Sequence, residues 1–220
     1  MLTKMMQTPF PGTEQRLLEA AGEIFAEHGY RAATVRQICE KAKANVAAIN
    51  YHFRDKDGLY LAVLRHLNKV HAEKNPTNSA LGSKATAEQK LRAFISAMLH
   101  RMLDEDSPDW HMKLMAREMI EPTHALDAMV EESVRPLQQE LEIIVREFLG
   151  ADAQDEVVRL STLSVASQCV FYHHCRSIIS RLFPQQKYGS QKIDTLVEHV
   201  TRFSLAALKN SAKERKRKSR

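Results

Sequence analysis

Two short stretches with the apolar spacing of a helix, 35–42 and 46–53, are separated by only three residues, Lys43 to Asn45. Thr34 followed by Gln37 has the spacing of a capping box, in which the two residues satisfy backbone N–H groups at a helix start. A helix of eight residues is unstable by itself and must pack on something else. The pattern therefore predicts two short helices joined by a tight turn and covered by a further helix.

The apolar positions indicate which segment covers the pair. Ile49 and Phe53 lie one helical turn apart and share a face, so they can pack inward together. The segment 13–28 carries apolar residues at three- and four-residue spacing, begins at the candidate N-cap Thr13 and ends at Gly29. The residues expected to pack on Leu17, Ile24 and Phe25 of this segment are Ile38, Cys39, Ala44, Ile49 and Phe53.

The rest of the chain also favours helices. Seven Gly and seven Pro are few for 220 residues, and Leu, Ala, Glu, Lys, Arg and Met recur. We expect an all-α protein with a helix-turn-helix domain over 1–56, a connecting helix over 57–75 and a helical C-terminal domain over 76–209. The tail 210–220 lacks an apolar face and is predicted to be disordered. Pro136 should kink or break its helix.

Charge is informative only locally. The chain carries a net charge of +5, but the tail from Lys209 to Arg220 holds seven basic residues against Glu214 alone. Removing that +6 from +5 leaves −1 for the rest of the chain, so overall basicity is poor evidence for a nucleic-acid partner. By contrast, the short segment 31–56 holds six basic and two acidic residues, a local charge of +4.

The second short helix has an outward face without Glu or Lys, which is unusual for a solvated helix. Its mixture of Val, Ala, Asn and Tyr suits the DNA major groove: Asn50 can bond an adenine edge, and Val46 and Ala47 can touch thymine methyl groups. Thr34 stands at a helix N-terminus, where backbone N–H groups favour a phosphate. The candidate DNA-binding residues are Thr34, Arg36, Asn45, Val46, Ala47, Asn50, Tyr51, His52 and Lys56.

The stretches ATVRQI (33–38) and VAAINYHF (46–53), followed by KDGL (56–59), resemble the helix-turn-helix of the TetR/AcrR family of transcriptional regulators. The likeness in order, spacing and residue type covers roughly 14–64. It implies a homodimer on a near-palindromic DNA operator, with the recognition helix in the major groove. It also implies a C-terminal domain that dimerises and binds a small-molecule effector.

This sequence departs from the family pattern at three positions. The family often has Gly where Lys43 and Ala47 stand, and commonly an aromatic residue where Asn50 stands. Lys43 in a left-handed turn would cost on the order of 1 kcal/mol, which a packed core tolerates. The change at Asn50 should alter which base is contacted.

The C-terminal part carries weaker signals. The stretches 111–118, 122–123 and 168–174 are similar to the CecR (CerR-type) subgroup of TetR regulators, which controls efflux and envelope functions. Flexible Met and aromatic side chains suit an adaptable apolar pocket, although the same spacing also describes an ordinary core. The candidate ligand-binding residues are Met98, Met102, Trp110, Met115, Phe171 and His174.

Cysteine and histidine usage leaves one alternative regulator open. Three cysteines form no pairing pattern, and no leader or membrane-spanning run is evident, so we expect a cytoplasmic protein. Cys169 and Cys175, with the neighbouring histidines, allow a redox- or metal-responsive regulator. However, His173 and His174 are adjacent and point about 100° apart on a helix, so they do not easily share a metal ion.

A helical enzyme using the same cysteines and histidines is the other rival. The sequence holds no nucleophile motif, no Gly-rich phosphate loop and no metal-ligand spacing. We therefore expect no enzyme activity, no cofactor and no bound metal. The favoured hypothesis is a ligand-responsive DNA-binding regulator, with repression as the expected mode.

Overall fold

The computed structural model describes residues 12–78, 81–82, 84–103, 108–185 and 190–218, and these contain helices but no strand. The expected all-α fold is confirmed. The chain divides into two compact units. Unit 1 comprises Met1–Leu67 and Asp109–Ala128, and unit 2 comprises Asn68–Pro108 and Met129–Arg220. No helix of the described ranges is long and apolar enough to cross a membrane.

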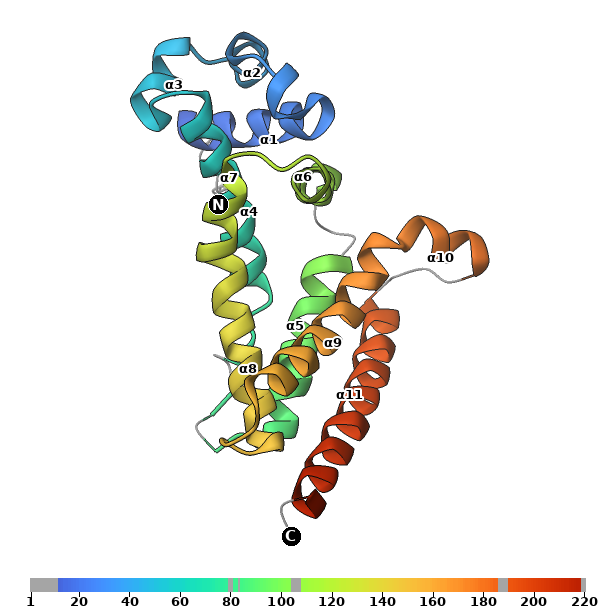
Figure 1. Cartoon of the computed structure of the whole chain (residues 1–220). Coiled ribbons are helices and arrows are strands. Elements are labelled where there is room, and N and C mark those ends of the chain that lie inside the picture. Colours follow the sequence, from blue (N-terminus) through green and yellow to red (C-terminus); the bar gives the residue numbers. More distant parts are fainter. Residues whose placement is uncertain (1–11, 79–80, 83, 104–107, 186–189, 219–220) are drawn as a thin grey trace, which may run out of the picture. The chain divides into compact units, whose positions relative to one another are not determined.

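Unit 1 is built around its first helix. Its elements are α1 (Thr13–Ala32), α2 (Val35–Ala42), α3 (Val46–Phe53), α4 (Lys56–Lys74, up to Leu67), α6 (Asp109–Ile120) and α7 (Ala125–Met129, up to Ala128). In Figure 1, α2 and α3 lie on one side of α1, and α6 lies on the other. Ile38, Ile49 and Phe53 join the buried cluster of α1, as their spacing predicted, and Leu59 of α4 completes it.

Helix α6 docks on α1 through two close contacts. The Trp110 ring lies directly on Gly22, where an added Cβ would come within 2.0 Å of the ring. Arg117 donates hydrogen bonds from Nη1 to the carbonyl oxygens of Ala26 and Glu27, at 3.3 and 3.2 Å. We expected residues 109–120 to belong to the C-terminal domain, 76–209, but α6 lies in unit 1. The contacts that hold it there join distant parts of the chain, which helical periodicity does not reveal.

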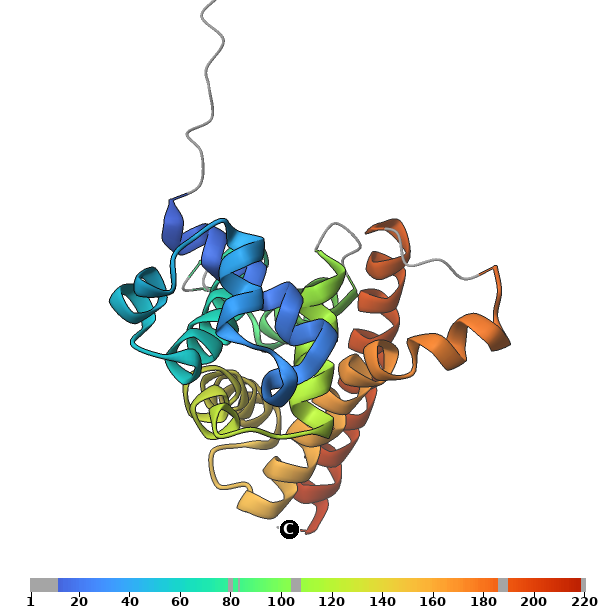
Figure 2. The ribbon, with the colours of Figure 1, turned by 90° about the horizontal axis from the view of Figure 1, so that it is seen from above.

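Unit 2 is a cluster of four helices, each of which contacts the other three. They are α5 (Ala87–Leu103), α8 (Arg135–Leu149), α9 (Asp155–His174) and α11 (Ser190–Lys218), shown in green, yellow, orange and red in Figure 1. Buried Leu, Ile, Val and Phe side chains fill the space between them. The short helix α10 (Arg176–Leu182) follows α9 and projects from the cluster in both views (Figures 1 and 2).

Two features of unit 2 refine the sequence prediction. A wide π-helical turn (Val130–Val134) leads into α8, where Pro136 is the second residue, because proline has no N–H to continue the regular pattern. The tail, predicted to be disordered, instead continues α11 to Lys218. Arg215 donates to the Leu149 carbonyl oxygen and to Asp152, which fixes this end of the helix. Residues 219–220 of that prediction lie outside the described residues.

Candidate DNA-binding interface

The start of α2 is fixed by the predicted capping box. The Gln37 N–H donates to Thr34 Oγ1 at 3.3 Å, and the Thr34 N–H donates to Gln37 Oε1 at 2.9 Å. This reciprocal pair satisfies two backbone donors and orients the first turn. The remaining N–H groups of a first turn have no partner within the helix, so the exposed start of α2 is a suitable place for an anion.

The turn between α2 and α3 depends on a left-handed lysine. Lys43 has φ 50° and ψ 48°, as the departure from glycine predicted. The Ala44 N–H donates to the Cys39 carbonyl oxygen at 3.0 Å, which closes the end of α2. This conformation costs about 1 kcal/mol for a residue with a Cβ. The buried side chains on either side of the turn hold it in place.

The N-cap of α3 uses a residue that was predicted to contact DNA. Asn45 Oδ1 accepts a hydrogen bond from the Ala47 N–H at 3.0 Å. The Asn45 side chain is exposed, and its amide NH₂ still provides two donors. The side-chain oxygen of Asn45 therefore caps α3, and only the side-chain NH₂ group is available to DNA.

Helix α3 has two contrasting faces. Ile49 is fully buried and Phe53 is nearly so, whereas Val46 is 46% exposed and Tyr51 is 85% exposed. Ala47 and Asn50 are also exposed. This pattern matches the predicted orientation, with the apolar pair on the core and a mixed surface of methyl, amide and phenol groups facing outward.

Lys56 differs from the other predicted contacts because its ammonium is already engaged. Nζ donates to the Ala33 carbonyl oxygen at 2.9 Å and lies 4.5 Å from the centre of the Tyr30 ring. Lys56 thus joins the start of α4 to the residue before the Thr34 cap. The other two donors of the ammonium remain for a phosphate.

Of the two other predicted basic groups, the Arg36 guanidinium is exposed and the His52 ring is partly buried. Arg36 forms a surface ion pair with Glu40, with Nε and Oε1 2.9 Å apart. Such a pair contributes little to stability and can open when a phosphate approaches. The His52 ring lies edge-on to the Tyr51 ring, and its Nδ1 is 4.0 Å from Glu14 Oε2.

Sequence reasoning missed a buried acid that organises unit 1. Glu118 of α6 has no solvent exposure, and its carboxylate accepts bonds from the Tyr60 hydroxyl at 2.5 Å and from the Thr123 N–H at 2.8 Å. The pKa of Tyr60 is raised, first because its hydroxyl is buried and second because the Glu118 carboxylate is close by. The hydroxyl therefore stays protonated. The sequence does carry one indication that Glu118 is buried: it has helical spacing with His111 and Leu114 and shares their buried face.

The predicted ligand-binding residues are not gathered within one unit. Met98 and Met102 of α5 pack on the core of unit 2, whereas Trp110 and Met115 of α6 pack on the core of unit 1. The remaining two residues, Phe171 and His174, are exposed on α9. Helical spacing identified these side chains as apolar or amphipathic but could not assign them to one of two cores.

The cysteines give the redox alternative no structural support. Cys169 is fully buried, and burial raises the pKa of its thiol to about 12, which suppresses the reactive thiolate. Cys175 follows six residues later, about 9 Å along a helix axis, which is too far for a disulfide. In the part of the chain that the structure describes, no three His, Cys, Asp or Glu side chains are grouped to hold a metal ion.

A capped α2, a tight turn and an exposed α3 held on a third helix define a helix-turn-helix regulator. Two family models match this chain. The model for "Bacterial regulatory proteins, tetR family" matches residues 17–63, and that for "HTH-type transcriptional dual regulator CecR, C-terminal domain" matches residues 87–208. The chain belongs to the TetR family of transcriptional regulators and carries the CecR-type C-terminal domain. Its family comprises DNA-binding regulators, which are not enzymes.

Individual relatives agree with this assignment. The chain is 26% identical over 196 residues to the HTH-type transcriptional dual regulator CecR of Shigella flexneri, covering 86% of this chain and 87% of that protein. It is 26% identical over 175 residues to the HTH-type transcriptional repressor NicS of Pseudomonas putida, covering 76% of this chain and 79% of that protein.

Solved structures show the same fold. A transcriptional regulator from Pseudomonas aeruginosa PAO1 superposes with a TM-score of 0.65 at 22% identity, covering 92% of each chain. The fatty acid degradation regulator FadR from Bacillus halodurans gives a TM-score of 0.61 at 15% identity, covering 87% of this chain and 97% of that chain.

Proposed function

We propose that this protein is a homodimeric, ligand-responsive repressor that recognises a palindromic operator through α3. The observation that carries the proposal is the division of α3 into a buried face, Ile49 and Phe53, and an exposed face of methyl, amide and phenol groups. A solvated helix normally exposes charged side chains. An exposed face with small and amide side chains matches base edges in the major groove.

The proposed roles follow from position and chemistry. Asn50 bonds an adenine edge, Val46 and Ala47 contact thymine methyl groups, and the small Ala47 allows the helix backbone to approach closely. The start of α2 at Thr34 receives a phosphate. The side chains proposed to contact the DNA backbone are Arg36, Asn45, Tyr51, His52 and Lys56.

An exposed apolar stripe in unit 2 supports a dimer. Leu160, Leu163 and Phe171 of α9 are each about half exposed and follow helical spacing, and Phe203 of α11 is 62% exposed. A shallow cavity of about 440 Å³ lies between Phe171 and Phe203. Exposed apolar surface of this kind marks an interaction site, and in a symmetric dimer the same patch on one copy covers that on the other.

The proposed mode of regulation and the proposed target genes rest on similarity to known relatives. NicS is described as a repressor and CecR as a dual regulator, so repression is the proposed mode and activation at other promoters is compatible with it. We place the effector site in unit 2 and the protein in the cytoplasm, where its operator is accessible. Efflux or envelope genes are the proposed targets, by likeness to the CecR subgroup.

Selection of bound sites from random duplex DNA tests this function with the full chain. We expect an enriched palindrome whose half-site centres lie about 10–10.5 base pairs apart, or a multiple of that, because two recognition helices must enter successive major grooves. Ala47→Glu places a carboxylate on the exposed face of α3 and should abolish enrichment. The matched control, Gln139→Glu on the exposed surface of α8, makes the same charge change and should leave enrichment intact. Enrichment of no motif, or of an asymmetric one, contradicts the proposal.

A further inference from the structure

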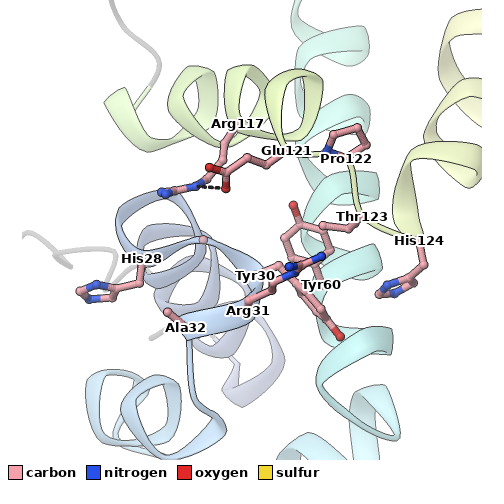
Figure 3. Close-up of a pocket in the computed structure, with 11 residues that line it drawn as sticks. His28, Tyr30, Arg31, Ala32, Tyr60, Arg117, Glu121, Pro122, Thr123 and His124 are labelled. Atoms are coloured by element: carbon pink, nitrogen blue, oxygen red, sulfur yellow. Dashed lines mark hydrogen bonds and ion pairs between the residues drawn. The ribbon is translucent and has the colours of Figure 1, made fainter.

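Unit 1 contains a groove that the proposed DNA contacts do not use. Its volume is about 720 Å³, within the range of small-molecule sites. It lies between the end of α1, α4 and the connection from α6 to α7, and none of the nine proposed DNA-binding residues lines it. Figure 3 shows Tyr30, Arg31 and Tyr60 in the middle of the groove, with Pro122, Thr123 and His124 along its other side.

Hydrogen bonds hold both walls of this groove in place. On one wall, Gly29 has φ 77°, which turns the last residues of α1 away from the helix axis. Arg117 binds the carbonyl oxygens of Ala26 and Glu27 just before that bend. On the other wall, Glu118 binds both Tyr60 and Thr123. The groove is therefore formed before any ligand arrives, which lowers the entropic cost of binding.

Arg31 supplies an available positive charge in the groove. The Tyr30 hydroxyl donates to Asp57 and the Tyr60 hydroxyl donates to Glu118, so neither offers a proton to a ligand. Glu121, the acidic residue of the lining, is paired with Arg117 at 3.5 Å. Arg31 is exposed, and no ion pair or hydrogen bond of its guanidinium occurs among the described residues. In the view of Figure 3 its side chain extends toward Thr123.

We propose that this groove binds a small organic anion, whose carboxylate or phosphate pairs with Arg31 and whose apolar body lies against Tyr30 and Pro122. A guanidinium suits both anions because its planar donors match two oxygens at once. The half-buried ring of Tyr30 and the exposed ring of Pro122 supply the apolar surface, whereas the Tyr60 ring is buried. The site is distinct from any effector pocket in unit 2, and it adjoins the turn that leads to the Thr34 cap.

Isothermal titration calorimetry of the full chain tests this site, with phenyl phosphate and benzoate as separate probes and benzyl alcohol as the neutral comparison. We expect saturable binding of at least one anion and none of the alcohol, and the stronger anion identifies the preferred group. Arg31→Ala should weaken binding about tenfold or more, because it removes a charge-assisted contact. Ala32→Glu, which adds a carboxylate to the lining, should weaken it as well.

Arg54→Ala is the matched control, because it removes an exposed arginine of the same unit that lies outside the groove and outside the proposed DNA contacts. Equal binding by Arg31→Ala and the unaltered protein, or equal losses with Arg31→Ala and Arg54→Ala, overturns the proposal. The absence of saturable binding by either anion overturns it too. If Arg31→Ala then weakens binding to all DNA sequences alike, Arg31 is a contact to the DNA backbone instead.

Discussion

Helices α3 and α9 both expose apolar side chains, but they expose different kinds. The outward face of α3 combines the small apolar Val46 and Ala47 with the amide of Asn50. The outward stripe of α9 carries Leu160 and Leu163, with serines between the larger side chains. The first surface suits a partner that presents both methyl groups and hydrogen-bonding edges, and the second suits another apolar surface. The composition of an exposed face thus indicates the chemistry of its partner.

The largest expected effect comes from placing charge on the α9 stripe. Leu163→Glu should convert the proposed dimer to a monomer, because the substitution buries an unpaired carboxylate in the proposed interface. Operator affinity should then fall about 100-fold or more, since the two half-sites are no longer bound together. Sedimentation velocity and fluorescence anisotropy measure the two effects. Gln139→Glu, on the exposed surface of α8 and with the same change in charge, should alter neither. A Leu163→Glu protein that stays dimeric places the interface elsewhere.

The next largest effect concerns base choice on α3. Asn50→Ala should reduce discrimination at one base pair of each half-site by about 1–3 kcal/mol, the value of a good bidentate contact to adenine. Repeating the site selection with this variant measures the change. Tyr51→Phe serves as the comparison, because loss of a hydroxyl that is proposed to contact the DNA backbone should weaken all sequences alike. An unchanged motif with Asn50→Ala would show that Asn50 does not contact a base.

Lys56 should give a smaller effect with two components. Lys56→Met removes the ammonium but keeps most of the aliphatic stem over Tyr30. DNA affinity should fall on all sequences, and the salt slope should decrease by about one for each protomer. The free energy of unfolding should also fall by about 1–2 kcal/mol, because the Ala33 carbonyl oxygen loses a charged donor. Lys56→Arg should restore part of the DNA affinity, and an unchanged salt slope in Lys56→Met would limit Lys56 to its structural role.

The smallest effect is expected at the basic end of α11. Removal of 213–220 should lower the free energy of unfolding by about 1 kcal/mol, because Arg215 no longer binds Leu149 and Asp152. Removal of 216–220 retains Arg215 and should leave stability unchanged. Both truncations should weaken salt-sensitive, non-specific DNA binding without changing the selected motif. Chemical denaturation and filter binding compare the two, and equal stability of both truncations argues against the role given to Arg215.

Local interactions made much of the helix-turn-helix predictable. The Thr34 capping box, the left-handed Lys43 and the two faces of α3 depend on residues within a few positions of each other, and the sequence pattern records such relations directly. Several of the contacts that escaped prediction join distant segments. Lys56 reaches Ala33 across 23 residues, and Glu118 reaches Tyr60 across 58.

Unit 2 was harder to predict for a related reason. Apolar spacing identified its long helices, yet it could not distinguish a side chain that packs on a core from one that lines a pocket. Met98 and Met115 look alike in sequence but belong to different units. The tail was assigned from its lack of apolar residues, and the bonds of Arg215 to α8 and the following loop were not visible in that pattern.

The contact of Trp110 with Gly22 has a practical consequence for anyone who wishes to transplant the DNA specificity of this regulator. A chimaera cut after Leu67 would contain α1 with Gly22 exposed, because it would lack the Trp110 indole that covers this glycine. The graft must therefore include residues 109–128 as well. Otherwise the recipient protein must already have a large aromatic ring at the Trp110 position of its own α6. Two separated pieces of gene, not one, encode the transferable module.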